Sequence, residues 1–134
     1  MADRHTERHM QIGEAAERVG LSIGTIRHYA DAGLVVPSAR SEGGFRLYTE
    51  PDLDRLRVVK RMKPLGFTLE EMRDLLQLLD RLATAEGDER AGLQDRLGTF
   101  HTAAQARVQA LREQLATAEG FAQQIQDHIE LHNH

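Results

Sequence analysis

Apolar residues recur at helical spacing in two short segments near the start of the chain. Gly20, between them, allows the backbone conformation that ends a helix and turns the chain, and Ser22 is a favourable N-cap for a second helix. The first segment carries four apolar residues on one helix face, namely Ile12, Ala15, Ala16 and Val19. In the second segment, Leu21 and Ile26 fill the space beneath the turn. The pattern predicts two short helices joined by a tight turn.

The second predicted helix exposes polar side chains that suit DNA. Arginine donates hydrogen bonds in a fork, and threonine and tyrosine each donate one, so these side chains reach phosphates and base edges when their helix lies in a major groove. The exposed residues are Thr25, Arg27, His28 and Tyr29. An ordinary helical hairpin with a solvated polar face is the alternative.

A short β-hairpin is predicted next. The pair Gly43-Gly44 is a two-residue turn signal. Arg40 and Arg46 flank the tip on opposite strands, and the aromatic Phe45 and Tyr48 are interleaved with them. A small hairpin that carries arginines beside a helix-turn-helix is a wing, which contacts phosphates next to the groove being read.

Two capped helices follow the hairpin. Thr49 opens the first with Asp52 as the partner in a capping box, and Thr68 with Glu71 opens the second in the same way. The first helix turns its basic residues outward, and we select Lys60 as a DNA-binding candidate, with a solvated face as the alternative. The apolar stripes are Leu53, Leu56, Val59 and Met62 in the first helix and Leu69, Met72, Leu75, Leu76 and Leu79 in the second.

These segments are similar, in order and spacing, to the MerR family of bacterial transcription regulators. The resemblance covers Met10 to Leu79, and beyond that range only the general plan agrees. The segments that carry it are Ile12-Gly13-Glu14, Thr25-Ile26-Arg27-His28-Tyr29, Gly33-Leu34, Gly44-Phe45-Arg46-Leu47-Tyr48, Asp52-Leu53-Asp54-Arg55-Leu56 and Leu65-Gly66-Phe67-Thr68-Leu69-Glu70-Glu71-Met72.

The resemblance implies a homodimer that binds a palindromic element in double-stranded promoter DNA. It further implies that the dimer bends and untwists this DNA for RNA polymerase and responds to a small-molecule effector near the C-terminal helix. By position, Arg27 and Tyr29 resemble the family's contacts from the recognition helix, and Arg46 and Tyr48 resemble its contacts from the wing. His28 stands where the family usually has Tyr or Phe.

The remainder of the chain predicts one long helix. Apolar residues recur in alternating steps of three and four without proline from about Arg90 to Leu131, and a single helix cannot bury such a narrow stripe. The family plan supplies a partner in the antiparallel helix of a second subunit, whereas the alternative is a hairpin within the chain that breaks at Gly120. The dimerisation candidates are Leu97, Phe100, Ala104, Val108, Leu111, Leu115, Ala118, Ala122, Ile125 and Ile129.

A net charge of −4 is unusual for a DNA-binding protein, but the charge is distributed unevenly between the two parts of the chain. Residues 1–76 hold 12 basic and 12 acidic side chains, whereas residues 77–134 hold 5 basic and 9 acidic ones. The acidity therefore lies away from the predicted DNA-binding unit, where local basic patches remain positive.

Catalytic and metal chemistry find little support in the sequence. The chain has no cysteine, which excludes thiolate metal sites and disulfides within it. No catalytic triad, nucleotide loop or carboxylate pair has a reactive setting, so we expect neither enzyme activity nor a cofactor. The metal-ligand candidates are His128, His132 and His134, the first two one helical turn apart, but a polar chain end is the commoner interpretation.

We therefore predict a fold dominated by α-helix, in which a winged helix-turn-helix with a small two-stranded wing precedes a long dimerisation helix in an antiparallel coiled coil. The expected divisions are a polar N-terminal extension over 1–9, a DNA-binding domain over 10–79, a linker over 80–92, a dimerisation helix over 93–131 and a tail over 132–134. The DNA-binding candidates are Ser22, Thr25, Arg27, His28, Tyr29, Arg40, Arg46, Tyr48 and Lys60.

The predicted function is sequence-specific regulation of transcription through DNA distortion. The alternatives are an architectural or excision-accessory protein that bends DNA without an effector, and a helical interaction module whose basic faces are incidental. No apolar run is long enough to cross a membrane and the first residues lack a signal-peptide core, so we expect a cytoplasmic location and no membrane partner.

Overall fold

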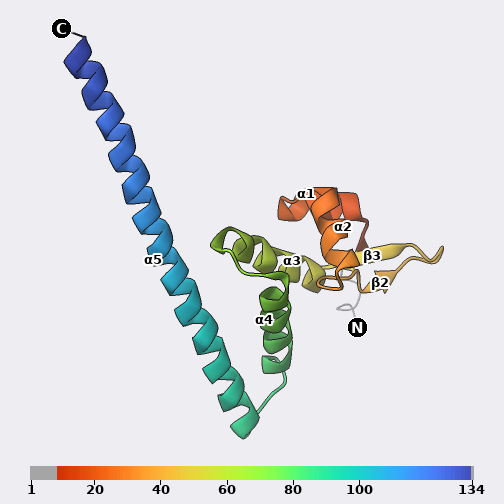
Figure 1. Ribbon diagram of the computed structural model, residues 1–134. Coiled ribbons are helices and arrows are strands. Elements are labelled where there is room, and N and C mark those ends of the chain that lie inside the picture. The colour runs from red at the N-terminus through yellow and green to blue at the C-terminus, as the bar shows by residue number, and fades with distance from the viewer. Residues whose placement is uncertain (1–8, 134) are drawn as a thin grey trace. The chain divides into compact units, whose positions relative to one another are not determined.

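The computed structural model describes residues 9–133 and divides into two compact units, one ending at Ala85 and one beginning at Glu86 (Figure 1). The first unit contains, in order, β1 (His9–Met10), α1 (Ile12–Val19), α2 (Ile23–Asp31), β2 (Ala39–Arg40), β3 (Arg46–Thr49), α3 (Glu50–Met62), the short 3-10 helix η2 (Lys63–Leu65) and α4 (Leu69–Leu82). The second unit is the single helix α5 (Gly87–His132). The predicted α-dominated fold with a small wing is confirmed.

The turn between α1 and α2 forms as the sequence predicts. Gly20 has a φ of 74°, a left-handed conformation that suits glycine, and its N–H donates to the carbonyl of Ala16. Ser22 caps α2 by accepting a hydrogen bond from the backbone N–H of Thr25 at 3.0 Å. Ile26 is fully buried beneath the turn. These interactions set the direction in which α2 leaves α1.

The wing differs from the prediction in its number of strands. The structure has a three-stranded antiparallel sheet in the order β1-β3-β2, in which Met10 pairs with Tyr48 and His9 with Thr49. A strand of two residues is too short to show an alternating pattern, so β1 could not be predicted from the sequence. In the structure, Met10 is only 1% exposed and anchors β1 in the core. Of the N-terminal extension predicted over 1–9, residues 1–8 lie outside the described residues.

The turn at the wing tip is also longer than the predicted two-residue turn. Gly44 N–H donates to the carbonyl of Ser41 and Ser41 N–H donates to that of Phe45, so Glu42 and Gly43 occupy the centre of the turn. A type I′ turn would need both central residues at positive φ, but of the two glycines only Gly44, with a φ of 86°, is there. A type I turn followed by a left-handed glycine fits these bonds.

A buried polar cluster joins the wing to α3. Both predicted capping boxes are present, and in the first of them Asp52 is only 4% exposed. Its carboxylate accepts hydrogen bonds from the backbone N–H of Ser38 at 3.0 Å, the hydroxyl of Ser38 at 2.9 Å and the backbone N–H of Thr49 at 2.9 Å. Because a buried carboxylate is stable only when it is well hydrogen-bonded, this cluster ties the residue before β2 and the last residue of β3 to the start of α3.

The predicted apolar stripe of α3 lies in the core, whereas that of α4 does so only in part, and Leu78, outside the predicted stripe, is 1% exposed. Leu53, Leu56 and Val59 are fully buried, and Met62 is 6% exposed. On α4, Met72 and Leu76 are buried, whereas Leu69, Leu75 and Leu79 are half-buried. Helix α3 ends at Met62, before Pro64, and Gly66 then takes a left-handed conformation with a φ of 82°. The break separates α3 from α4.

The second unit corrects two expectations. Helix α4 continues to Leu82 and α5 begins at Gly87, so the connection is shorter than the expected linker over 80–92, because Asp88 and Glu89 favour a helix N-terminus directly after Gly87. Helix α5 runs unbroken through Gly120, and the alternative of an intrachain hairpin is wrong. Among the described residues, no helix combines the length and apolar character needed to cross a bilayer.

Candidate nucleic-acid interface

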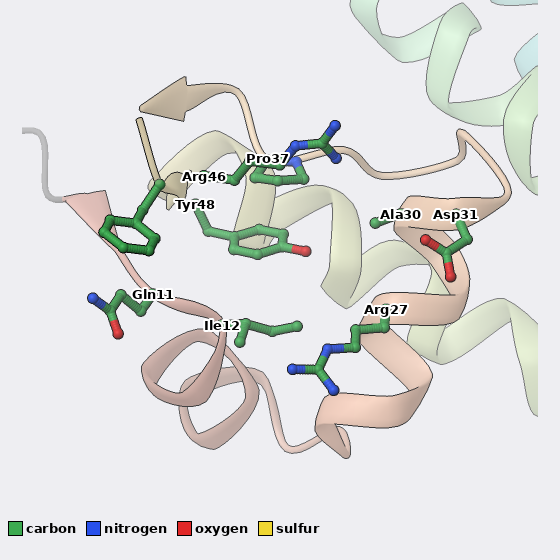
Figure 2. A pocket seen from close by; sticks show the side chains of 9 residues that line it. Gln11, Ile12, Arg27, Ala30, Asp31, Pro37, Arg46 and Tyr48 are labelled. Carbon is green, nitrogen blue, oxygen red and sulfur yellow. The ribbon is translucent and has the colours of Figure 1, made fainter. Parts of the chain in front are cut away.

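A cleft of about 430 Å³ lies between α2 and the wing, and we call it the wing cleft. Arg27 enters it from α2, and Arg46 and Tyr48 enter it from β3; in the view of Figure 2, the two arginines lie on opposite sides of the Tyr48 ring. Within residues 9–133, no hydrogen bond or ion pair occupies either guanidinium, so both are available to a ligand. The cleft is lined by Gln11, Ile12, Arg27, Ala30, Asp31, Pro37, Phe45, Arg46 and Tyr48.

The charges around the wing cleft act on the hydroxyl of Tyr48. Burial raises the pKa of this hydroxyl above its ordinary value of 10.0, and the carboxylates of Asp52 and Asp31 raise it further, while Arg46 and Arg27 oppose the rise. The hydroxyl therefore stays protonated at neutral pH and can donate a hydrogen bond. Two arginines and one neutral donor make the wing cleft suited to an anionic ligand such as a phosphate.

A second depression, of about 640 Å³, lies beside the N-terminus of α2, and we call it the turn hollow. Lys60 and Lys63 reach it from the end of α3 and from η2. The hydroxyl of Ser22, the N-cap of α2, also lines it and donates a hydrogen bond to the hydroxyl of Thr25 at 2.9 Å. The hollow is lined by Leu21, Ser22, Gly24, Thr25, His28, Tyr29, Lys60, Lys63 and Pro64. All of the DNA-binding candidates except Arg40 thus divide between two basic depressions that share α2.

The two tyrosines are less accessible than the sequence predicts. Tyr29 was expected to be exposed on the second helix, but its side chain is 3% exposed, as is that of Tyr48. The helical period places Tyr29 on the same side as Ile26, so most of its ring belongs to the core. One edge of Tyr29 still lines the turn hollow, and burial raises the pKa of its hydroxyl.

Two of the basic residues predicted to bind DNA donate hydrogen bonds to backbone carbonyls of the protein itself. A guanidinium nitrogen of Arg40 donates to the carbonyl of Gly44 at 3.2 Å, within the wing tip, and Arg40 lies directly opposite Arg46 in the strand register. The Nζ atom of Lys60 donates to the carbonyl of Val19 at 2.9 Å, at the end of α1. Arg27, His28 and Arg46 are exposed and donate no such bond to the backbone within residues 9–133.

The DNA-binding candidates chosen from the sequence leave out several residues that line this interface. Phe45 is 68% exposed on the wing and lines the wing cleft, and its position between arginine-bearing strands was the available signal. Asp31 and Lys63 line the two depressions. Asp31 lies four residues after Arg27, which puts both on one side of α2 and could have been read from helical spacing.

The ten dimerisation candidates all lie on α5, and none of their side chains is buried in the single chain. The exposed fraction reaches 43% for Leu111 and 58% for Leu115. Near the end of α5, the rings of His128 and His132 are parallel within 7°, with centroids 6.4 Å apart, as their spacing predicts. His134 lies outside the described residues, and among residues 9–133 no cluster of three or more ligand side chains fits a metal ion.

Comparisons with known proteins agree with this arrangement. The family profile described as MerR HTH family regulatory protein matches residues 10–79, and the profile described as MerR, DNA binding matches residues 53–128. The mercuric resistance operon regulatory protein of Bacillus cereus is 45% identical over 71 residues, which are 53% of this chain and 54% of that protein. The chain therefore spans about half the length of this curated relative.

Two further relatives extend the similarity beyond the first unit. The HTH-type transcriptional regulator HmrR of Rhizobium leguminosarum bv. viciae is 44% identical over 88 residues, which are 66% of this chain and 67% of that protein. A crystal structure of a MerR family transcriptional regulator from Bacillus cereus has a TM-score of 0.61 at 26% identity, covering 87% of this chain and 79% of that one. With two profiles that each match more than half of its residues, the chain belongs to the MerR family of helix-turn-helix regulatory proteins.

Proposed function

We propose that this chain regulates transcription as a homodimer that binds a palindromic promoter element and distorts it. The observation that carries the proposal is the pair of basic depressions on either side of α2, the wing cleft and the turn hollow. A major groove is about 12 Å wide and admits one α-helix between two phosphate backbones. A helix flanked by two cationic depressions matches that geometry, with α2 in the groove and one backbone in each depression.

Each depression offers donors suited to phosphate. Arg27 and Arg46 are accessible in the wing cleft, and Lys63 is exposed in the turn hollow beside the capped end of α2. Arginine and lysine contacts to phosphates supply most of the affinity for DNA, whereas contacts to base edges supply specificity. We assign Arg27 and His28, which project from α2, to base edges, and Arg46 to a phosphate.

The division of charge supports the same assignment. Residues 1–85 carry 13 basic and 13 acidic side chains, and residues 86–134 carry 4 basic and 8 acidic ones. The whole net charge of −4 thus belongs to the second unit. A neutral unit that places Arg27, Arg46 and Lys63 in depressions beside α2 attracts DNA locally, and the acidic helix α5 is better suited to a protein partner than to phosphate.

Dimerisation follows from the exposed stripe of α5. An isolated helix of 46 residues with apolar residues in steps of three and four gains stability by packing against a second such helix. An antiparallel pairing of two copies would bury the stripe and present two α2 helices to successive major grooves, about 34 Å apart or a multiple of that distance. Deforming the intervening DNA is then a way to control RNA polymerase.

The effector is proposed to differ from that of the mercuric resistance regulator to which the chain is similar. Cysteine is absent from these 134 residues, so no thiolate metal site can be assembled from them. We propose an organic or acidic ligand at the seam of the α5 pair, where apolar side chains from two copies meet.

The test begins with selection of bound duplexes from a random pool by the purified chain. Recovery of a palindromic consensus, a footprint on it and a change in transcription by RNA polymerase from a promoter that contains it are the expected results. A footprint and bending without any effect on transcription would favour the architectural alternative. Absence of a consensus would contradict the proposal.

A further inference from the structure

Two long cationic side chains, from α3 and α4, donate hydrogen bonds to backbone carbonyls at the end of α1, just before α2, and at the C-cap of α2. We infer that Lys60 and Arg73 are positioning residues, which orient the recognition helix for DNA by hydrogen-bonding backbone carbonyls rather than by contacting phosphates. The inference rests on the proposed DNA binding by α2, and it reassigns Lys60 from the role that the sequence predicted.

Lys60 acts at the entrance to α2. Its Nζ atom donates to the carbonyl of Val19 at 2.9 Å. Val19 is the last residue of α1, and the final carbonyls of a helix have no partner within the helix. The turn needs glycine for its φ of 74°. A Cβ atom on Gly20 would lie 2.7 Å from Nζ, so a larger residue there would displace the end of the Lys60 side chain from its hydrogen bond.

Arg73 acts at the exit from α2. Its Nη2 atom donates to the carbonyl of Ala32 at 2.7 Å, and Ala32 is the C-cap of α2. A cation at a helix C-terminus also interacts favourably with the helix dipole. Each of the two bonds joins residues 41 positions apart, so neither is a local helix contact.

These bonds connect both α2 and the wing to α3 and α4, and so help to fix the orientation of α2 relative to the wing. Helix α3 is tied to the wing strands through Asp52, which accepts hydrogen bonds from Ser38 and Thr49. The same helix reaches the turn before α2 through Lys60. The angle between α2 and the wing therefore depends on Lys60 at one end and Arg73 at the other, and this angle decides whether α2 and the wing can engage the groove and its backbone together.

A positioning role and a phosphate contact have different signatures. Removing a phosphate contact makes the dependence of log affinity on log salt shallower by about one and weakens binding to all sequences alike. Removing a positioning bond leaves the count of phosphate contacts unchanged, but it costs affinity for the selected duplex because base contacts are misaligned. Selectivity between duplexes and the salt slope thus separate the two roles.

The experiment compares Lys60→Met and Arg73→Met with Arg61→Met, a neighbouring exposed cation on α3 with no hydrogen bond or ion pair within residues 9–133. Dissociation constants are measured at several salt concentrations for the duplex selected from a random pool and for a scrambled duplex. We expect Lys60→Met and Arg73→Met to lose about tenfold or more affinity for the selected duplex, with little change on the scrambled one and the wild-type salt slope. Arg61→Met should affect both duplexes equally.

A second variant guards against simple loss of folding. Gly20→Ala places a methyl group against Nζ while keeping the charge of Lys60, so it should reduce selectivity without changing the salt slope, and adding Lys60→Met to it should cost little more. Circular dichroism at the assay temperature checks that each variant is folded. A shallower salt slope in Lys60→Met, or unchanged selectivity in the folded variants, would overturn the inference. Failure of the wild-type chain to select any duplex would instead overturn the proposed function.

Discussion

Arg27 and Arg46 reach the wing cleft from different elements, and the difference predicts different losses. Arg27 projects from α2, so Arg27→Ala should cost on the order of 1 to 3 kcal/mol in binding and relax the preference at one base position. Arg46 lies on the wing, so Arg46→Ala should weaken binding to every sequence and make the salt slope shallower by about one. Titrations of the selected duplex and its single-base variants check both, with Arg112→Ala on α5 as the control. Wild-type affinity in both variants would contradict the assignment.

The two tyrosines of the chain provide a second prediction, because both are buried and burial raises the pKa of each hydroxyl above 10.0. A raised pKa in the folded state means that the unfolded state loses these protons first as the pH rises. The contribution of the two tyrosines to the free energy of unfolding should therefore be constant below pH 10. It should fall as the pH rises from there through the pKa values of the folded state. Urea denaturation as a function of pH measures the fall, and Tyr29→Phe/Tyr48→Phe should flatten it. An equally steep fall in the double variant would show that other groups cause it.

The role of a single residue could be predicted from the sequence when its hydrogen-bond partner lies only a few positions away. Ser22, Thr49 and Thr68 were recognisable as caps because their partners lie three residues away. The bonds of Lys60 and Arg73 cross 41 residues and leave no periodic trace in the sequence. The burial of the tyrosines was missed because tyrosine has both a polar hydroxyl and an apolar ring. Only tertiary packing decides whether the ring is buried.

At the scale of elements, the geometry of the wing turn makes a testable distinction between adjacent glycines. Gly44 has a φ of 86°, so Gly44→Ala should destabilise the protein by about 1 kcal/mol through backbone strain. Gly43 is outside the left-handed region, and a Cβ atom there would lie 3.4 Å from the Phe45 ring, so Gly43→Ala is the matched control with a smaller effect. Urea denaturation measures both. Equal losses would mean that the turn does not have the bonding found here.

Elements with strong periodicity were predictable, and short ones were not. The stripes of α3 and α4 and the two capping boxes locate those helices from the sequence alone. Strand β1 has only two residues, and its place beside β3 is fixed by the burial of Met10 rather than by any pattern. The two-residue turn signal of Gly43-Gly44 was misleading, because the same dipeptide also fits a longer turn with one left-handed glycine.

The end of α5 bears on metal binding. His128 and His132 share a face, but among residues 9–133 no third ligand side chain completes a cluster with them, and two imidazoles leave half of a tetrahedral zinc site to water. Calorimetry with Zn²⁺ and Ni²⁺ should therefore give binding weaker than about 1 µM, little changed in His128→Ala/His132→Ala. Tighter binding that disappears in the double variant would instead make this pair a metal site and a candidate sensor.

At the scale of the whole molecule, the two units divide the work of recognition. The first unit is neutral overall and places Arg27, Arg46 and Lys63 beside α2, whereas the second carries the entire net negative charge and an unburied apolar stripe. Each unit therefore has a surface that lacks a partner within the chain: cationic side chains beside α2 in the first unit and the apolar stripe of α5 in the second. One of these surfaces calls for an anion and the other for an apolar partner, which is why we propose DNA for the first and a second copy of the chain for the other.

The dimer proposal predicts that DNA binding depends on α5, although α5 does not touch DNA in the proposed complex. Leu111 and Leu115 lie near the middle of the stripe and are 43% and 58% exposed in the single chain, so Leu111→Asp/Leu115→Asp should place four charges in the seam of a dimer and yield a monomer. Affinity for a full palindrome should then fall by roughly a hundredfold or more, because two linked half-sites lose their tether. Gln109→Asp/Ala116→Asp adds the same charges on the opposite side of α5 and should remain a dimer. Sedimentation velocity measures the assembly, and a Leu111→Asp/Leu115→Asp variant that still sediments as a dimer would move the interface elsewhere.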